Sequence, residues 1–296
     1  MYRFEAPFEP VLRAFKRLAL SHFLCEEVCI LGKNASISEI IGLVQRRFCK
    51  ESIAFRVRRI RGSVLPQEAA SLERELNIKA KEAGLLVDLE NPRNAMEVIA
   101  SEGFLLVGRK ICLSDRRRVF SRSGSTKPFF HPSSLKVELA RAMLNLARVR
   151  EDSVVLDPFS GTGTILVEAN ELRAIPVGVE IDPAMAYLSL RNYKWFRAFR
   201  VCQVLGDARQ IPLRSVDAIV TDPPYGRRAS THGLESLRVY KGFIEESSRV
   251  LHDKGWIVFL APSEMPVEDF LVSNGFRIIE TYFIEVHKSL TRKLLV

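Results

Sequence analysis

Apolar positions recur with two different periods along the second half of the chain. Residues 135–147 carry apolar side chains at helical spacing, and short apolar runs then alternate with longer helical patterns. The runs predict strands at 154–156, 177–179, 201–205, 216–220 and 256–261, and the patterns between them predict helices at 164–172, 184–198, 237–251 and 266–274. This alternation is typical of a parallel sheet covered by helices on both faces. The tail, 276–296, predicts two more strands.

A different alternation fills the first hundred residues and predicts a small α+β module. Strands are predicted at 54–60, 85–89 and 104–111, and helices at 66–84 and 91–103. Pro66 and Gly84 are start and stop signals of the first long helix. Residues 113–130 contain Ser, Gly, Pro and Arg without periodicity, so they predict a linker that lies on the surface between two domains.

Composition narrows the class of protein. The chain of 296 residues is 47% hydrophobic, which allows a sizeable core and suggests about two domains. No apolar run approaches the roughly 18 residues of a membrane helix, and the N-terminal stretch lacks the apolar segment of a signal peptide. The five cysteines form no CxxC pair, which favours reduced thiols in the cytoplasm and argues against a disulfide framework or a metal site.

The distribution of charge along the chain bears on the kind of partner that the protein binds. A net charge of +9 is compatible with a polyanionic partner without proving one. Two arginine clusters lie in the part of the chain that carries no catalytic motif, and a solvated face is the simplest explanation of each. Their position favours a surface for nucleic acid instead. The candidate RNA-binding residues are Arg56, Arg58, Arg59, Arg61, Arg116, Arg117 and Arg118.

A loop with two glycines follows the first predicted strand of the second half. The stretch DPFSGTGT, 157–164, stands between a strand and a helix, where glycines let the backbone approach a ligand closely. Leu166 replaces the third glycine of the dinucleotide fingerprint, and no lysine follows as in a P-loop. The carboxylate of Asp157 would repel a pyrophosphate, whereas it would attract an ammonium group.

Acids also stand at the next two strand ends. Glu180, with Asp182 close by, can accept hydrogen bonds from both hydroxyls of a ribose. The pair Asp207-Ala208 places a side-chain acceptor beside a backbone donor, which suits the amine edge of adenine. Each acid could instead cap a helix. Together with the loop they predict a ligand with an amino acid end, a ribose and an adenine but no phosphates, and S-adenosyl-L-methionine has this chemistry.

The fourth strand end is DPPYG, 222–226, and the simple alternative is a strand followed by a Pro-Gly turn. Neither proline has an N–H, so this edge offers only acceptors. The Asp222 carboxylate and the Pro223 carbonyl can hold the two hydrogens of a planar exocyclic amine and point its nitrogen at a methyl donor. Tyr225 offers a flat face to a base that has left its stack. Asp222 can accept the proton released after transfer.

Taken in order, DPFSGTGT, GVEID, GDAR and DPPYG resemble the amino-methyltransferases that modify exocyclic amines of nucleic acid bases. The stretch VDLENPRNAMEVI, after a basic strand and a helix, resembles the THUMP RNA-binding domain. With FFHPSSLKVELARAMLNLARV between the two parts and HKSLTRKLLV at the end, the arrangement is similar to the archaeal tRNA guanine-N2 methyltransferases that act at position 10.

This resemblance implies an α/β fold in which a THUMP-like module, 41–112, precedes a linker, 113–130, and a Rossmann-like methyltransferase domain, 131–296. Residues 1–40 are short for the ferredoxin-like domain of such enzymes. The implied active-site residues are Asp222, Pro223, Pro224 and Tyr225. The implied cofactor residues are His131, Pro132, Asp157, Phe159, Ser160, Gly161, Thr162, Gly163, Thr164, Glu180, Ile181, Asp207, Ala208 and Asp222.

The resemblance also implies S-adenosyl-L-methionine as the cofactor, tRNA as the partner, no metal, and one or two methyl groups added to guanosine N2. We expect a cytoplasmic protein and favour a monomer. Three alternatives stay open at this point. The substrate could be guanine-N2 in ribosomal RNA or at another tRNA position, or adenine-N6 in DNA, which the THUMP-like module disfavours. The chain could also be a tRNA-binding protein with an inactive catalytic domain, which the intact Asp222 stretch disfavours.

Overall fold

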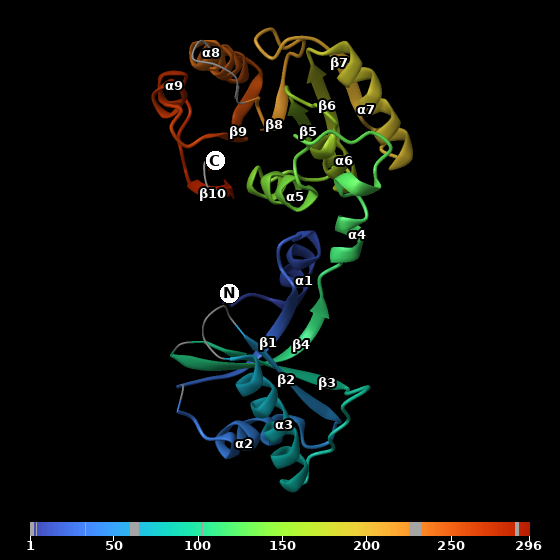
Figure 1. Ribbon diagram of the computed structural model, residues 1–296, viewed down its shortest axis with the longest axis vertical. Helices are drawn as coiled ribbons and strands as arrows, with labels where there is room; N and C mark the ends of the chain where they lie inside the picture. The colour runs from blue at the N-terminus through green and yellow to red at the C-terminus, as the bar shows by residue number, and fades with distance from the viewer. Residues whose placement is uncertain are drawn as a thin grey trace. The chain divides into compact units, whose positions relative to one another are not determined.

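The computed structural model describes residues 3, 5–32, 34–59, 65–101, 103–224, 232–287 and 290–296. The chain divides into two compact units (Figure 1). The N-terminal unit consists of residues 1–16 and 21–114, and the C-terminal unit of residues 17–20 and 115–296.

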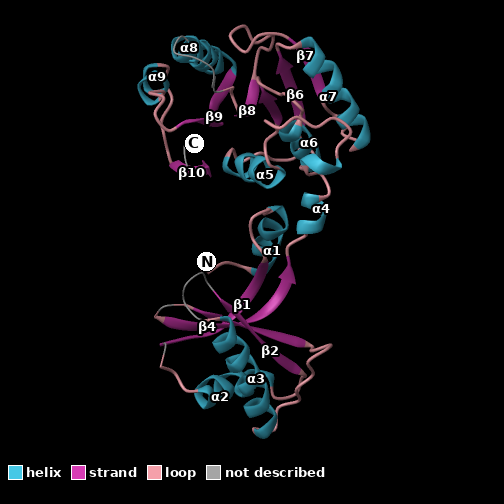
Figure 2. Ribbon diagram, in the orientation of Figure 1, coloured by secondary structure: helices cyan, strands magenta, loops and turns pink. Residues whose placement is uncertain are grey.

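The N-terminal unit contains a four-stranded sheet, and the helices Ile37–Phe48 and Pro66–Glu82 pack on one of its faces (Figure 2). Its strands are β1 (Phe23–Gly32), β2 (Ile53–Arg59), β3 (Asn94–Ala100) and β4 (Phe104–Leu113), in the order β1-β4-β3-β2. β2 and β3 are parallel, and the other neighbours are antiparallel. The helices are α1 (Phe8–Arg17), α2 (Ile37–Phe48) and α3 (Pro66–Glu82). Apolar residues of α2 and α3 form one core with alternate residues of the strands.

Three predictions for this unit are wrong. The helix expected at 91–103 is the strand β3, because Met96, Val98 and Ala100 are buried at every second position and the strand pairs with both β2 and β4. The strand expected at 85–89 is reduced to a single bridge between Val87 and Ile53. Residues 1–40 are not a separate segment, because β1 pairs with β4 along its length.

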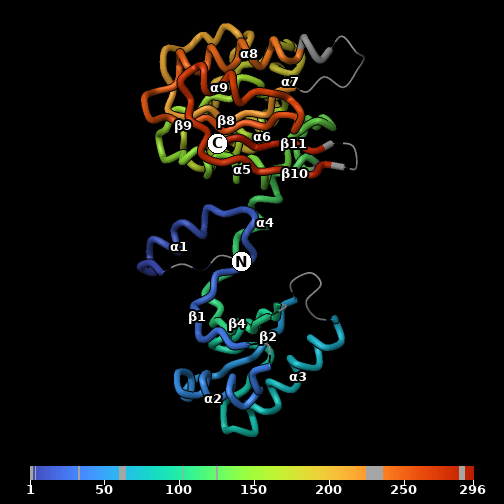
Figure 3. The backbone as a smooth tube through the Cα atoms, turned by 90° about the vertical axis from the view of Figure 1, so that its left-hand side faces the viewer, coloured from blue at the N-terminus to red at the C-terminus, as the bar shows by residue number. Residues whose placement is uncertain are grey.

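The C-terminal unit contains a seven-stranded sheet in the order β10-β11-β9-β8-β5-β6-β7. The strands are β5 (Val154–Asp157), β6 (Ile175–Glu180), β7 (Cys202–Leu205), β8 (Val216–Thr221), β9 (Leu251–Pro262), β10 (Thr281–His287) and β11 (Leu290–Leu295). β5 to β9 are parallel, whereas β11 is antiparallel to β9 and to β10, between which it lies (Figure 3). The helices are α4 (Arg116–Phe120), η1 (Gly124–Thr126), α5 (Val137–Leu146), α6 (Thr164–Glu171), α7 (Pro183–Trp195), α8 (His232–Val250) and α9 (Glu268–Ser273).

Successive residues of the central strands face opposite cores. Leu156 and Ile219 pack with α8 and α9 on one face, and Val155 and Ala218 pack with α5 and α6 on the other. The predicted parallel sheet with helices on both faces is therefore confirmed. No helix in the described part of the chain is long and apolar enough to cross a membrane.

Residues 113–130 are not the surface linker that the sequence predicted. Arg122 and Lys127 are buried in the C-terminal unit. The Arg122 guanidinium donates to both oxygens of Glu168 on α6, with NH2 3.2 Å from Oε2, and Arg141 on α5 donates to the same carboxylate at 2.7 Å. Because Glu168 is fully buried, these ion pairs fix the segment against the helices.

Candidate active site

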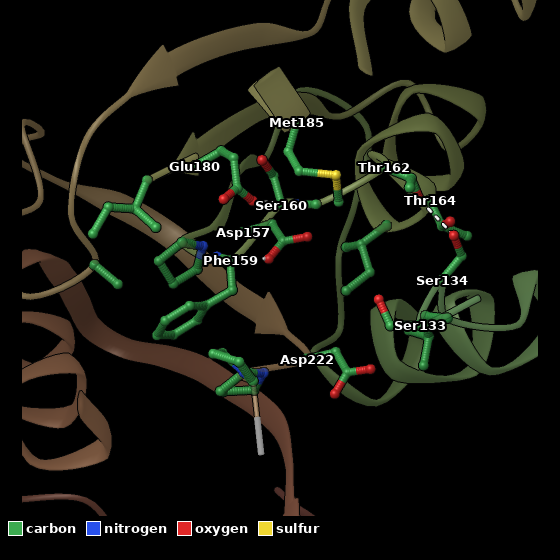
Figure 4. Close-up of a pocket in the computed structure, with 18 of the residues that line it drawn as sticks. Ser133, Ser134, Asp157, Phe159, Ser160, Thr162, Thr164, Glu180, Met185 and Asp222 are labelled. Atoms are coloured by element: carbon green, nitrogen blue, oxygen red, sulfur yellow. Dashed lines mark hydrogen bonds between the residues drawn. The ribbon is translucent and has the colours of Figure 1, made fainter. Parts of the chain in front are cut away.

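A cavity of about 540 Å³ opens where the strand order of the C-terminal unit reverses, between β5 and β8. Ligands of open parallel sheets bind at this place, beyond the carboxyl ends of the strands. Glu180, Asp157 and Asp222 reach the cavity from the ends of β6, β5 and β8 (Figure 4). The predicted site residues that line it are Asp157, Phe159, Ser160, Gly161, Thr162, Thr164, Glu180, Ile181, Asp207, Ala208, Asp222, Pro223 and Pro224.

The glycine loop from β5 to α6 has the backbone that its sequence requires. Gly161 and Gly163 have φ angles of +50° and +80°, which residues with a Cβ rarely adopt. A Cβ on Gly163 would also lie 2.2 Å from the Tyr193 ring. Gly163 itself is the N-cap of α6 and does not line the cavity. The loop therefore turns tightly and presents its backbone on the cavity side.

Asp157 is a buried carboxyl at the centre of the site. One of its oxygens accepts hydrogen bonds from the Thr221 hydroxyl at 2.6 Å and from the Phe159 N–H at 3.2 Å. The pKa of Asp157 is raised to about 7: burial is the largest cause, the nearby carboxylates of Asp222 and Glu180 add to it, and the two hydrogen-bond donors oppose it. A carboxyl with this pKa gains its charge near neutral pH, so it is ready to pair with a cationic group of a ligand.

Glu180 is fixed at the rim by two backbone donors. Its two oxygens accept from the Gly161 N–H at 2.8 Å and the Asp182 N–H at 3.0 Å, so each oxygen retains acceptor capacity. Asp182 has the role that the sequence left open as an alternative, because its carboxylate caps α7 by accepting from the N–H groups of Ala184 and Met185. Of these two acids, Glu180 alone lines the cavity.

Asp207 has a cationic neighbour, Arg209, in addition to the adenine edge predicted as its partner. The Arg209 guanidinium donates to both carboxylate oxygens, with distances of 3.0 and 2.6 Å, and lowers the pKa of Asp207. Arg209 lies beside it in the cavity wall. An amine that reached Asp207 would share the carboxylate with this guanidinium. The stretch GDAR contained the signal, since residues two apart in a turn can pair.

Asp222 follows β8 and also has a cationic partner. Both of its oxygens accept from Arg292 on β11, with NH1 3.2 Å from Oδ2 and NH2 bonded to Oδ1. Burial raises the pKa of Asp222, and the bonds from Arg292 oppose this effect. Pro223 and Pro224 continue the wall, whereas Tyr225 lies outside the described residues.

The segment before α5 contributes other residues to the cavity than the sequence predicted. His131 and Pro132 do not line the cavity, but Ser133, Ser134 and Leu135 do. The His131 ring bonds to the Ser133 hydroxyl at 2.6 Å, and the backbone N–H of His131 donates to the Ser134 hydroxyl. Further lining residues absent from the prediction are Pro158, Ile165, Met185, Arg209 and Val239.

A buried lysine, Lys127, bonds to two of the residues that line the cavity. The Lys127 ammonium donates to the hydroxyls of Thr162 at 2.7 Å and Thr164 at 3.1 Å. The Thr162 hydroxyl also bonds to the Ser134 hydroxyl at 3.0 Å (Figure 4). Burial lowers the pKa of Lys127 to about 8. This chain of bonds links the segment before α5 to the glycine loop.

The predicted arginine clusters lie in both units. Arg58 bonds to Glu97 at 2.9 Å, and Arg56 lies 3.7 Å from Glu73, so Arg56 and Arg58 are partly neutralised. In the other cluster Arg118 pairs with Glu171 at 3.0 Å, Arg117 is exposed and Arg116 stacks on Phe120. Arg61 lies outside the described residues.

The cavity's donors and acceptors fit S-adenosyl-L-methionine. Among the described lining residues Arg209 is the only cation, and it pairs with Asp207, so the wall is poorly suited to a pyrophosphate. In the described part of the chain no group of three or more His, Cys, Asp and Glu could hold a metal. The fold and site together define the class as a Rossmann-like, S-adenosylmethionine-dependent methyltransferase.

Comparison with known proteins agrees with this class. Residues 125–293 match the family model described as "RMKL-like, methyltransferase domain". The tRNA (guanine(10)-N2)-dimethyltransferase of Methanothermobacter thermautotrophicus is 33% identical over 283 residues, which are 95% of this chain and 83% of the relative. The enzyme of the same name from Pyrococcus abyssi is 31% identical, over 94% of this chain and 84% of the relative. The chain therefore belongs to the family of tRNA (guanine(10)-N2)-dimethyltransferases.

The crystal structure of TrmN from Thermus thermophilus has the same fold. It superposes with a TM-score of 0.57 over 99% of this chain and 87% of that protein, at 22% sequence identity.

Proposed function

We propose that this enzyme methylates the exocyclic N2 amine of guanosine 10 in tRNA. The observation that carries the proposal is the position of Asp222 and Pro223, which line the same cavity as the glycine loop and the acids of the next two strand ends. An acceptor pair beside a methyl donor is the arrangement that a neutral amine requires. The names of the two relatives supply the base, the atom and the position.

In this proposal the chain holds the cofactor by its three parts. Asp157 accepts the ammonium group, Glu180 accepts from the ribose hydroxyls, and Asp207 with the Ala208 N–H receives the adenine edge. S-adenosyl-L-methionine, when bound, supplies an electrophilic methyl group. Because the pKa of Asp157 is about 7, the carboxyl is only partly ionised at neutral pH in the free protein. An ammonium partner would favour the ionised carboxylate.

The chain's contribution to the reaction is to orient the amine. The Asp222 carboxylate and the Pro223 carbonyl accept one hydrogen each, which directs the nitrogen toward the methyl group. When the new bond to carbon forms, the nitrogen loses a proton, and the Asp222 carboxylate is positioned to accept it. We propose that Tyr225 stacks on the base.

We further propose that the N-terminal unit is a THUMP-like RNA-binding module. Between β2 and α3 it has a groove of about 860 Å³ whose walls include three arginines of β2. Arg74 and Lys81 of α3 add positive charge on the other side, against one acid, Glu73. Such a groove suits the phosphate backbone of RNA, which is recognised chiefly by charge and shape. In the C-terminal unit, Arg116, Arg117 and Arg118 are further candidates for contacts with RNA phosphates.

Methyl transfer to a panel of nucleic acids tests the proposal. Purified protein is incubated with methyl-tritiated S-adenosyl-L-methionine and a tRNA transcript, the same transcript with guanosine 10 replaced by adenosine, ribosomal RNA or duplex DNA. Incorporation only into the first substrate is expected. Equal incorporation into the first two would contradict the assignment of position 10, and incorporation into ribosomal RNA or DNA alone would contradict tRNA as the substrate.

A further inference from the structure

An arginine from the far end of the chain holds the carboxylate that faces the amine. Arg292 lies on β11, which is separated from β8 by β9, and it reaches Asp222 across a sequence separation of 70 residues. The two guanidinium NH2 groups bind one carboxylate oxygen each, a paired geometry that fixes the plane of the carboxylate. The side chains are only 7% and 15% exposed, so little solvent screens the pair.

The charges around Asp222 make Arg292 important for its protonation. Burial favours the neutral carboxyl, and the Asp157 carboxylate at the end of the neighbouring strand has an unfavourable interaction with it. Arg292 supplies the opposing effect, both by hydrogen bonds and by charge. A neutral carboxyl would offer one acceptor oxygen and a competing O–H, and it could not take up a proton.

We propose that Arg292 is a positioning residue for methyl transfer: it holds the Asp222 carboxylate ionised and in one orientation, so that a free lone pair faces the amine of the substrate. This inference rests on the proposed function of Asp222. Arg292 does not line the cavity, so it acts through Asp222 and not on the substrate.

The neighbouring residue provides a matched control. Lys293 is also buried, also on β11, and pairs with Glu268 of α9 at 2.6 Å, away from the cavity. If Arg292 merely tied β11 to the sheet, replacing either residue would have the same kind of effect. The proposal predicts that replacing Arg292, unlike replacing Lys293, changes how activity depends on pH.

The experiment compares wild-type protein with Arg292→Met, Arg292→Lys and Lys293→Met. Single-turnover methyl transfer to the tRNA transcript is measured from pH 5.5 to pH 9, with saturating S-adenosyl-L-methionine. In Arg292→Met the acid limb of the profile should move to higher pH by about one to three units, because an opposite charge at this distance lowers the pKa of an aspartate by that amount. Arg292→Lys, which keeps the charge, should show a smaller move, and Lys293→Met none.

A second readout needs no substrate. Carbon-13 NMR of labelled aspartate carboxyls, assigned with Asp222→Asn, reports the titration of Asp222 in the wild type and in both Arg292 variants. Wild-type protein that failed to methylate any RNA would contradict the proposed function, and the titration would still test Arg292. An Asp222 pKa unchanged in Arg292→Lys and Arg292→Met would overturn the inference. So would an active Arg292→Met variant with the same acid limb as Lys293→Met.

Discussion

The ends of β5 and β8 carry two aspartates in one cavity with opposite surroundings. Asp157 has hydrogen bonds from a hydroxyl and a backbone N–H but, within the described residues, no ion pair. Asp222 already holds a guanidinium on both oxygens. The two acids therefore suit different partners. A buried carboxyl without a cation is suited to receive one from its ligand, whereas a carboxylate that the protein already pairs with a guanidinium is suited to a neutral amine.

The largest expected effect is a loss of activity, without a loss of cofactor affinity, when Asp222 after β8 is replaced. Asp222→Asn should lower single-turnover methyl transfer by at least about a thousandfold, on the order of 4 kcal/mol, because the amide cannot accept the proton. Affinity for S-adenosyl-L-methionine, measured by titration calorimetry, should stay close to that of the wild type.

Asp217→Asn is the control for that variant. Asp217 lies on the same strand, β8, at its opposite end, where its carboxylate accepts from the Val154 N–H at 2.7 Å. Activity within tenfold of wild type for Asp222→Asn would show that the carboxylate does not serve the reaction.

The next test removes the charge of Asp157 at the end of β5. Asp157→Asn should weaken the binding of S-adenosyl-L-methionine by about ten- to a hundredfold, since a charged hydrogen bond contributes roughly 1.5–3 kcal/mol. In the wild type the affinity should rise as the pH increases through about 7, because the carboxyl must ionise to pair with an ammonium group. In Asp157→Asn that dependence should disappear. Calorimetry at pH 6 and pH 8 measures both, and a pH dependence that persists would remove Asp157 from this role.

Although Asp157→Asn should weaken cofactor binding, it should stabilise the folded, ligand-free protein at high pH. The pKa of Asp157 in the folded chain, about 7, lies above its ordinary value of 3.8, so the free protein loses stability as the pH rises between these values. At pH 8 the ligand-free Asp157→Asn variant should be more stable than the wild type, by on the order of 2 kcal/mol. At pH 4.5 the difference should be smaller. Thermal unfolding at both pH values decides this, and a lower melting temperature of the variant at pH 8 would contradict it.

A smaller effect is expected at Glu180. Glu180→Gln keeps the shape and removes the charge, so the affinity for S-adenosyl-L-methionine should fall by about tenfold. The affinity for methionine, which lacks the ribose, should not change. Equal losses for both ligands in titration calorimetry would mean that the variant disturbs the glycine loop, because Glu180 also holds the Gly161 N–H.

The smallest effect is expected from substitutions in the N-terminal unit, which leave Asp157 and Asp222 unchanged. Replacing Arg74 and Lys81 by Ala in the groove of the N-terminal unit should weaken tRNA binding severalfold and reduce the slope of its logarithmic salt dependence by about one to two. Binding of S-adenosyl-L-methionine should be unchanged. Filter binding across a salt series measures the slope, and an unaltered slope would assign the groove no contact with phosphate.

The sequence predicted those parts of the site that local chemistry determines. The glycine loop and the acids at the strand ends are contiguous motifs, and the cavity contains nearly all of them. Arg292 could not be predicted, because its partner lies 70 residues away and only the antiparallel placement of β11 brings them together. The apolar residues of β3 fit both the helical and the strand period, so the sequence alone favours a helix there, whereas pairing with two neighbouring strands makes it a strand. Lys127 and Arg122 were assigned to a surface linker because burial of a cation depends on the tertiary fold.

In the proposed reaction, an amine held by the Asp222 carboxylate receives the methyl group. The most direct measurement uses S-adenosyl-L-methionine with a deuterated methyl group, the tRNA transcript, and nucleoside and fragment mass spectrometry for the wild type and Asp222→Asn. We predict deuterated N2-methylguanosine at position 10 with the wild type, and none with the variant. A label on a ring nitrogen or on another base, or equal product from both proteins, would contradict this reaction.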